Sequence, residues 1–182
     1  NGQVSAMSIH PNDTESLSGE DLAAITERIA AHFREGGTLG DLAGISDEQF
    51  EALYATAYRL YGTDQFEDAA KVFAYLGMTD PYDRRYTLGL GACQQMLKKW
   101  DEAIAAYTLC IALDVEDPVP AFHMAECVAG KGDLADAQTL MAEVVQRCKA
   151  PEHQALKQKA DAMLKLMALR AARTAPSARV QP

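Results

Sequence analysis

The amino-acid sequence predicts an all-α fold: a solenoid of three helical hairpins, preceded by one helix and closed by a capping helix. Three observations predict it, namely a 34-residue repeat, helix-capping signals ahead of the expected helices, and amphipathic stretches on both sides of the repeats. Repeats of about 20 to 50 residues are typical of stacked supersecondary units, each of which buries its apolar face only against its neighbours. We therefore expect one helical domain in this chain of 182 residues.

The repeat is counted from Phe50 and recurs without a gap. Its eighth and twentieth positions hold small residues, which let the two helices of a hairpin approach each other. Its twenty-fourth position holds a bulky residue that fills the groove beside them. These three positions are occupied by Ala57, Gly91 and Ala125, by Ala69, Ala103 and Ala137, and by Phe73, Tyr107 and Met141. Each unit is therefore expected to be a pair of antiparallel helices.

The segment ahead of the repeats, residues 18–45, is expected to form a helix and a linker. Ser18 and Asp21 form a capping box, which predicts a helix over residues 19–35. Its apolar residues recur at helical spacing and form one stripe, which has to be buried somewhere, either on the first repeat or in another copy. The stripe consists of Leu22, Ile25, Ile29 and Phe33. Residues 1–17 are expected to be disordered or derived from an expression vector.

The repeats themselves are expected over residues 46–151. Ser46 and Gln49 form a capping box ahead of the first hairpin. Beyond the repeats, an amphipathic stretch predicts a capping helix over residues 152–170, which covers the open face of the third hairpin. Residues 171–182 are expected to be a disordered tail. The expected hairpins lie at about 50–79, 84–114 and 118–148.

Composition and charge exclude several kinds of partner. The net charge of −9, from 17 basic and 26 acidic residues, gives no reason to expect a nucleic-acid partner. The longest apolar stretch, Ala103 to Leu113, is far shorter than the ~20 residues that cross a bilayer, so we expect no membrane insertion. The four cysteines show no C-x-x-C spacing and lie within apolar patterns, which indicates buried reduced thiols and favours the cytosol.

No arrangement in the sequence is typical of an enzyme. The four histidines are scattered, and none pairs with a carboxylate or a cysteine at a spacing that indicates catalysis. His123 and Cys127 share one helix face, but two ligands do not make a metal site. Cys127 also occupies the same repeat position as Cys93, so packing is the favoured interpretation. We expect no enzyme activity, no metal and no cofactor.

The 34-residue pattern is similar to that of tetratricopeptide repeats, and a longer set of motifs resembles a narrower family. These motifs are Gly36-Gly-Thr-Leu39, Lys71-Val-Phe-Ala-Tyr-Leu, Asp80-Pro-Tyr-Asp-Arg-Arg-Tyr-Thr-Leu-Gly-Leu-Gly-Ala-Cys93-Gln, Pro120-Ala-Phe-His-Met-Ala-Glu-Cys127 and Lys131-Gly-Asp-Leu-Ala-Asp-Ala137. Together they resemble the class II chaperones of type III secretion over roughly residues 20–167. This resemblance is more specific than any single motif.

The resemblance implies a bacterial cytoplasmic chaperone that keeps hydrophobic translocator proteins soluble before type III export. It further implies that the repeats form a concave trough for an extended translocator segment. Members of the family commonly dimerise through the N-terminal helical region, so a weak homodimer through the stripe of residues 22–33 is expected.

The residues expected in the trough come from the first helix of each hairpin, because this helix lines the concave side of stacked hairpins. Tyrosine offers an apolar ring and a hydroxyl for peptide groups, although a tyrosine stripe by itself is usually structural. Small residues between larger neighbours leave pockets for the side chains of a bound strand. The expected trough residues are Tyr54, Tyr58 and Tyr61 from the first unit, Arg85, Leu88, Ala92, Gln95 and Met96 from the second, and Val119, Phe122, Glu126 and Ala129 from the third.

Other functions of repeat proteins were weighed. A clamp for a C-terminal carboxylate needs Lys, Asn and Arg along the trough, whereas Tyr54 and Tyr58 stand at the first of those positions. A regulatory protein that binds a transcription factor, or a scaffold that binds an assembly component, has no sequence feature against it. These two alternatives remain open.

Overall fold

The computed structural model describes residues 18–174 of the chain. The expectations for residues 1–17 and 175–182 lie outside the described residues. Within residues 18–174 all regular structure is helical and no strand occurs, which confirms the all-α prediction. In chain order the elements are α1 (Gly19–Arg34), α2 (Leu39–Ala43), α3 (Asp47–Gly62), α4 (Phe66–Thr79), α5 (Arg84–Met96), α6 (Trp100–Leu113), α7 (Pro118–Lys131), α8 (Leu134–Arg147), the short 3-10 helix η2 (Pro151–His153) and α9 (Gln154–Thr174).

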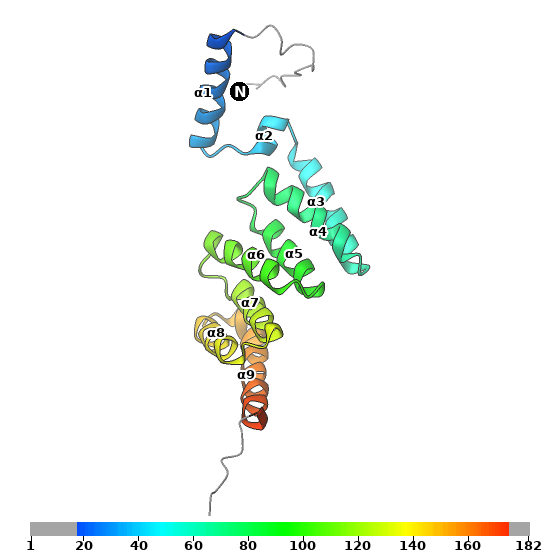
Figure 1. Ribbon diagram of the computed structural model, residues 1–182, viewed down its shortest axis with the longest axis vertical. Helices are drawn as coiled ribbons and strands as arrows, with labels where there is room; N and C mark the ends of the chain where they lie inside the picture. Colours follow the sequence, from blue (N-terminus) through cyan, green and yellow to red (C-terminus); the bar gives the residue numbers. More distant parts are fainter. Residues whose placement is uncertain (1–17, 175–182) are drawn as a thin grey trace, which may run out of the picture.

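The helices α3 to α8 form three hairpins, each stacked on the one before it, and α9 follows against α8 (Figure 1). The small residues of the repeat lie where the helices meet, and all six are buried. Two examples show how close the contact is. Ala57 has no exposed surface, and a Cβ atom added at Gly91 would lie 2.7 Å from the ring of Tyr107. The repeat register therefore reports helix packing, as predicted.

The turn inside each hairpin uses a left-handed backbone at one repeat position. Asp64, Lys98 and Gly132 occupy this position and have φ angles of 60°, 58° and 101°. A left-handed conformation costs a residue with a Cβ atom about 1–2 kcal/mol, whereas glycine adopts it freely. Of the three turns, only that of the third hairpin has glycine, Gly132, at the left-handed position.

Helix starts follow the capping signals in the sequence. Capping boxes are present at Ser18 with α1 and at Ser46 with α3, as predicted. A third box, between Thr38 and Asp41, begins α2, and the left-handed Gly44 ends it. The linker expected between the first helix and the repeats therefore contains a short helix that was not predicted from the sequence.

The capping helix is longer than predicted. It follows η2 and continues to Thr174, so the expectation of disorder from residue 171 is wrong for residues 171–174. Alanine and arginine favour helix, and the sequence contains no helix breaker before Pro176. Ala160 and Met167 of α9 are buried in one apolar cluster with Met141 of α8, so α9 covers the open end of the third hairpin.

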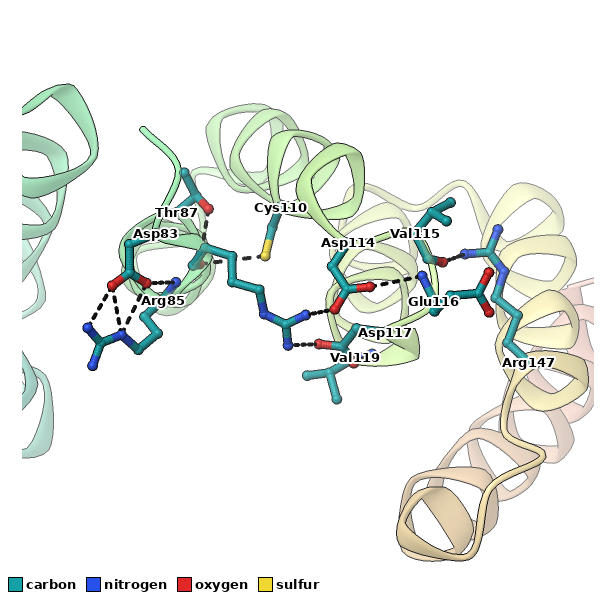
Figure 2. Close-up of polar contacts among 11 residues, drawn as sticks. Asp83, Arg85, Thr87, Cys110, Asp114, Val115, Glu116, Asp117, Val119 and Arg147 are labelled. Carbon is teal, nitrogen blue, oxygen red and sulfur yellow. Dashed lines mark hydrogen bonds and ion pairs between the residues drawn. The ribbon is translucent and has the colours of Figure 1, made fainter. Parts of the chain in front are cut away.

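Polar contacts join neighbouring hairpins where their second helices end (Figure 2). Arg84 at the start of α5 pairs with both Asp114 and Asp117, which flank the loop between α6 and α7. In the next hairpin, Nη1 of Arg147 donates a hydrogen bond to the carbonyl oxygen of Val115 at 3.3 Å. These contacts connect residues about one repeat apart. They add polar links between neighbouring hairpins to the apolar contacts between their helices.

Helix α1 stands apart from the stack (Figure 1), and none of its residues is buried. Leu22 is 52% exposed, and Ile29 and Phe33 are each 42% exposed. The apolar stripe of α1 therefore does not pack back on the first hairpin.

Two further sequence expectations concern the cysteines and the membrane. The four cysteines are free and buried, as expected, and burial raises the pKa of Cys93 to about 11. Between residues 18 and 174, no helix is both long enough and apolar enough to cross a bilayer.

Candidate functional site

A pocket of about 240 Å³ opens between the first helices of the hairpins, on the side that is concave in such solenoids. Five consecutive helices, α3 to α7, contribute to it, and most of its lining is aromatic or apolar. The lining residues are Tyr54, Tyr58, Tyr61, Phe73, Arg85, Leu88, Gly89, Ala92, Tyr107 and His123. A larger hollow of about 390 Å³ at the end of α8 is lined only by charged and polar side chains, so it offers no comparable apolar surface.

The three tyrosines of α3 share one helix face because they lie four and three residues apart. Tyr54 meets the ring of Phe73 edge-on at a centroid distance of 6.0 Å, and Tyr61 meets Phe66 in the same way at 5.4 Å. Both rings are thereby anchored in the first hairpin. Tyr58, in contrast, is 65% exposed, so most of its ring is available for contact with another molecule.

The floor of the pocket depends on a glycine. The ring of Phe73 lies across Gly89 of α5, where an added Cβ atom would come within 2.5 Å of that ring. Ala92 lies about one turn further along the same helix. Because the side chains at both positions are small, α5 fills little of the space between the surrounding rings. This space can take a side chain of a bound ligand.

Arg85 forms a charged rim at one side of the pocket. Its Nη2 atom lies 2.6 Å from Oε1 of Glu51 and 2.6 Å from Oδ2 of Asp83, and its guanidinium lies 4.8 Å over the ring of Tyr54. The hydrogen bonds with Asp83 and Glu51 raise the pKa of Arg85 above its ordinary value. Burial raises the pKa of Asp83, but the hydrogen bonds from Arg85 outweigh this and hold it below the ordinary range. Arg85 therefore packs over the ring of Tyr54. Its positive charge is already balanced by the carboxylates of Glu51 and Asp83.

A chain of hydrogen bonds forms the opposite wall. The hydroxyl of Tyr107 donates to Oε1 of Gln95 at 2.7 Å, and Nε2 of Gln95 donates to Oε2 of Glu126 at 3.0 Å. Nδ1 of His123 lies 2.9 Å from the same carboxylate oxygen. Burial raises the pKa of Glu126, but the bonds from His123 and Gln95 outweigh it, so the net pKa lies below the ordinary value. This wall holds an ionised carboxylate beside an apolar pocket.

The structure brings together about half of the residues expected in the trough. Six line the pocket directly: Tyr54, Tyr58, Tyr61, Arg85, Leu88 and Ala92. Gln95 and Glu126 lie behind the pocket in the hydrogen-bonded wall. Met96, which is half exposed at the end of α5, and the partly buried Val119 and Ala129 of α7 do not line the pocket.

Phe122 requires a correction. It was expected in the trough, but it is only 5% exposed and belongs to the apolar core of the third hairpin. The same core includes Ala160 and Met167 of α9, so the capping helix extends the core that encloses Phe122. At the third unit, the register position that faces the pocket is taken by His123.

Four lining residues were not predicted as site residues: Phe73, Gly89, Tyr107 and His123. Phe73 and Tyr107 come from second helices, at the bulky position of the repeat, where packing was the only role considered. Gly89 was considered as part of a motif of the family resemblance. The sequence places His123 on one helix face with Cys127, which is fully buried, whereas the partner of His123 in the structure is Glu126, one turn along the helix. The spacing of three residues between His123 and Glu126 was a usable signal.

The chain has clear relatives. It is 38% identical over 145 residues to the low calcium response locus protein H of Yersinia pseudotuberculosis, a match that covers 78% of this chain and 85% of that protein. The chaperone protein SicA of Salmonella typhimurium is 33% identical over 103 residues, which cover 57% of this chain and 62% of that protein. No family model matches the chain.

Solved structures share the fold. The translocator chaperone SycD of Yersinia enterocolitica superposes with a TM-score of 0.68 at 37% identity, covering 71% of this chain and 98% of that one. PcrH in complex with the chaperone binding region of PopD superposes with a TM-score of 0.67 at 37% identity, covering 70% and 97%. A type III secretion complex from Aeromonas hydrophila gives a TM-score of 0.75 at 31% identity, covering 80% and 98%.

Proposed function

Because the chain belongs to the class II chaperones of type III secretion, we propose that it binds an extended segment of a hydrophobic translocator protein in the aromatic pocket between its hairpins. The related SycD has been crystallised with a peptide of the translocator YopD, and PcrH with the chaperone binding regions of PopD and PopB. The chain is accordingly a chaperone of translocators. The residues that line its pocket are the proposed contacts of the client.

The observation that carries the proposal is the exposed ring of Tyr58 in a pocket of other rings. Large apolar surfaces left exposed in a monomer mark interaction sites, and aromatic residues dominate the energy of such interfaces. Tyr54 and Tyr61 are anchored by neighbouring rings, so they lose little conformational freedom when a ligand covers them. The pocket is thus built in advance for an apolar side chain.

An extended segment also has to satisfy its backbone groups. The lining tyrosines carry hydroxyl groups, and the carboxylate of Glu126 lies next to the lining residue His123, so donors and acceptors are present beside an otherwise apolar surface. This combination suits a hydrophobic strand better than a folded domain, because a strand exposes alternate side chains and backbone groups. The ligand held in this way is kept from aggregating.

The chaperone acts by binding alone, without catalysis, in the bacterial cytoplasm before its client is exported. The relatives that support this role are chaperones by name. The proposal assigns no chemical step to His123, which takes part in the pocket wall.

Self-association is assigned to helix α1. Its stripe of Leu22, Ile25, Ile29 and Phe33 is not buried by any of the residues 18–174 that the structure describes, and Leu39 and Leu42 of α2 extend the exposed apolar surface. An alternative dimer of the related SycD has been crystallised. The proposed assembly is a weak homodimer in which α1 of each copy contributes to the contact.

Co-expression tests the proposed function. The chain is expressed with each hydrophobic translocator encoded by the same bacterium, and the soluble complex is treated with protease to find the translocator segment that it protects. We expect one short, apolar protected segment, which then serves as the client probe. If the translocators stay insoluble and no segment is protected, the proposed function is refuted.

A further inference from the structure

His123 is the one titratable imidazole that lines the pocket, and its surroundings are unusual for a packing residue. Its ring stacks on the ring of Tyr107, with centroids 5.6 Å apart and planes 23° apart. The side chain is 37% exposed, and that of Glu126 is 26% exposed. Since a carboxylate only accepts hydrogen bonds, the Nδ1 atom of His123 carries a hydrogen, and a second proton would be taken up at Nε2.

Few charged groups surround the pair of His123 and Glu126, so a ligand that covers the pocket can change the protonation state of the pair. On α7 itself, Glu126 is the only charged partner of His123 among the described residues. From α5, Gln95 is neutral; from α6, the hydroxyl of Tyr107 stays protonated because burial raises its pKa. From α3, only tyrosines line the pocket. Also from α5, the charge of Arg85 is already balanced by Glu51 and Asp83. Lys159 of α9 exerts a weak attraction on Glu126.

A ligand that covers the pocket changes the balance between the two states of His123. With a neutral imidazole, the pair carries one negative charge, which loses part of its water when an apolar segment covers it, and burial of an unpaired charge is costly. With a protonated imidazole, the pair is an ion pair without net charge, which is far cheaper to cover. Covering the pocket therefore favours the protonated imidazole over the neutral one.

We propose that His123 and Glu126 form the polar anchor of the client-binding pocket, and that binding of the apolar client segment takes up a proton at this pair. This inference rests on the proposed function, because it requires a client in the pocket. It assigns to His123 a part in setting client affinity. It also predicts the direction of the effect: the chaperone holds its client more tightly as the pH falls from 8 to 5.5.

Binding measured across pH tests the anchor. The affinity of the protease-protected translocator segment is determined by fluorescence anisotropy between pH 5.5 and 8 for the wild type and three variants. In the wild type we expect the affinity to rise about fivefold to tenfold on acidification. His123→Gln should lose this rise. Glu126→Gln should reverse its sign, since covering the pocket then buries an unpaired imidazolium. His153→Gln, which changes a histidine of η2 away from the pocket, keeps the wild-type slope.

A second measurement needs no variant and therefore does not depend on their folding. Titration calorimetry at pH 7 in two buffers of different ionisation heat counts the protons taken up per bound segment. Uptake of a measurable fraction of one proton is expected. A wild-type affinity that is constant from pH 5.5 to 8, with no proton uptake, overturns the inference while leaving the proposed function intact. Absence of binding at every pH would instead refute the proposed function.

Discussion

Replacement of Tyr58 by alanine separates client binding from folding. Tyr58 is 65% exposed, and a tyrosine side chain presents roughly 200 Å² of surface, so about 130 Å² is available to a ligand. At about 25 cal/mol per Å², full burial of this area is worth at most ~3 kcal/mol. We expect Tyr58→Ala to weaken binding of the client probe by about 2 kcal/mol, which is roughly a 30-fold increase in Kd.

The same substitution should hardly affect stability, because exposed side chains contribute little to the free energy of unfolding. We expect a loss below about 0.5 kcal/mol in urea denaturation. The double variant Tyr58→Ala/Tyr61→Ala should bind more weakly still, but it also removes the contact between Tyr61 and Phe66 and so costs some stability. The single variant is therefore the cleaner test.

Two controls accompany it. Tyr75→Ala removes a tyrosine of α4 that is 42% exposed but does not line the pocket, so the Kd should not change. Ala57→Leu forces apart two helices at a residue without exposed surface, and it should cost about 1–3 kcal/mol of stability. If Tyr58→Ala unfolds as readily as Ala57→Leu, or binds the client like Tyr75→Ala, the assignment of Tyr58 to the binding surface is wrong.

Four further predictions concern stability and assembly. Gly91→Ala should lower the free energy of unfolding by about 2 kcal/mol, because its new Cβ atom would meet the buried ring of Tyr107. Lys98→Gly should raise it by roughly 0.5–1 kcal/mol by relieving a left-handed backbone, as denaturation would show. The pKa of Glu126 is lower in the folded chain than its ordinary 4.5, so its contribution is present above the unfolded pKa and lost as the pH falls through the folded value. The Tm measured by thermal unfolding should therefore fall between pH 6 and pH 3, and the fall should be smaller in Glu126→Gln than in the wild type. Ile29→Ser should raise the dimer dissociation constant about tenfold in sedimentation experiments.

Matched controls keep these results interpretable. Gly62→Ala places a Cβ atom in open space and should not destabilise the chain, unlike Gly91→Ala. Lys99→Gly changes the neighbouring residue, whose φ is −83°, and should give no gain. Ala24→Ser lies on the opposite face of α1 from the stripe and should leave the dimer unchanged. If Gly62→Ala destabilises the chain like Gly91→Ala, or Lys99→Gly stabilises it like Lys98→Gly, the explanation from the local backbone and packing is contradicted. If Ile29→Ser leaves the dimer dissociation constant unchanged, the dimer contact lies elsewhere.

The hairpins could be predicted because the repeat records contacts between neighbouring helices. Small residues such as Ala57 and Gly91 recur where two helices touch, and this contact depends on spacing along the chain alone. The position of Tyr54, Tyr58 and Tyr61 in the pocket could be predicted from the same register. The register places these tyrosines on the side of the stack that no neighbouring hairpin covers. Helix α2 escaped prediction because five residues are too short to show a period.

The remaining site residues depended on contacts between elements, which a register does not specify. Phe122 and His123 are adjacent on α7, yet one is buried in the core that includes α9 and the other faces the pocket. Adjacent residues of a helix point in different directions, so the packing of α7 on its neighbours determines which of the two is buried. The role of Tyr107 likewise depends on its hydroxyl reaching Gln95 across two helices, a contact that no spacing within α6 predicts.

Site-specific crosslinking tests the central claim most directly. A photoreactive phenylalanine analogue is placed at position 58, in the pocket, or at position 75 of α4, which is exposed but does not line the pocket, and each chaperone is irradiated with the full-length translocator. The claim predicts a crosslink from position 58 to the protease-protected segment and none from position 75. A crosslink from position 75 alone would contradict it, because the client would then lie outside the pocket.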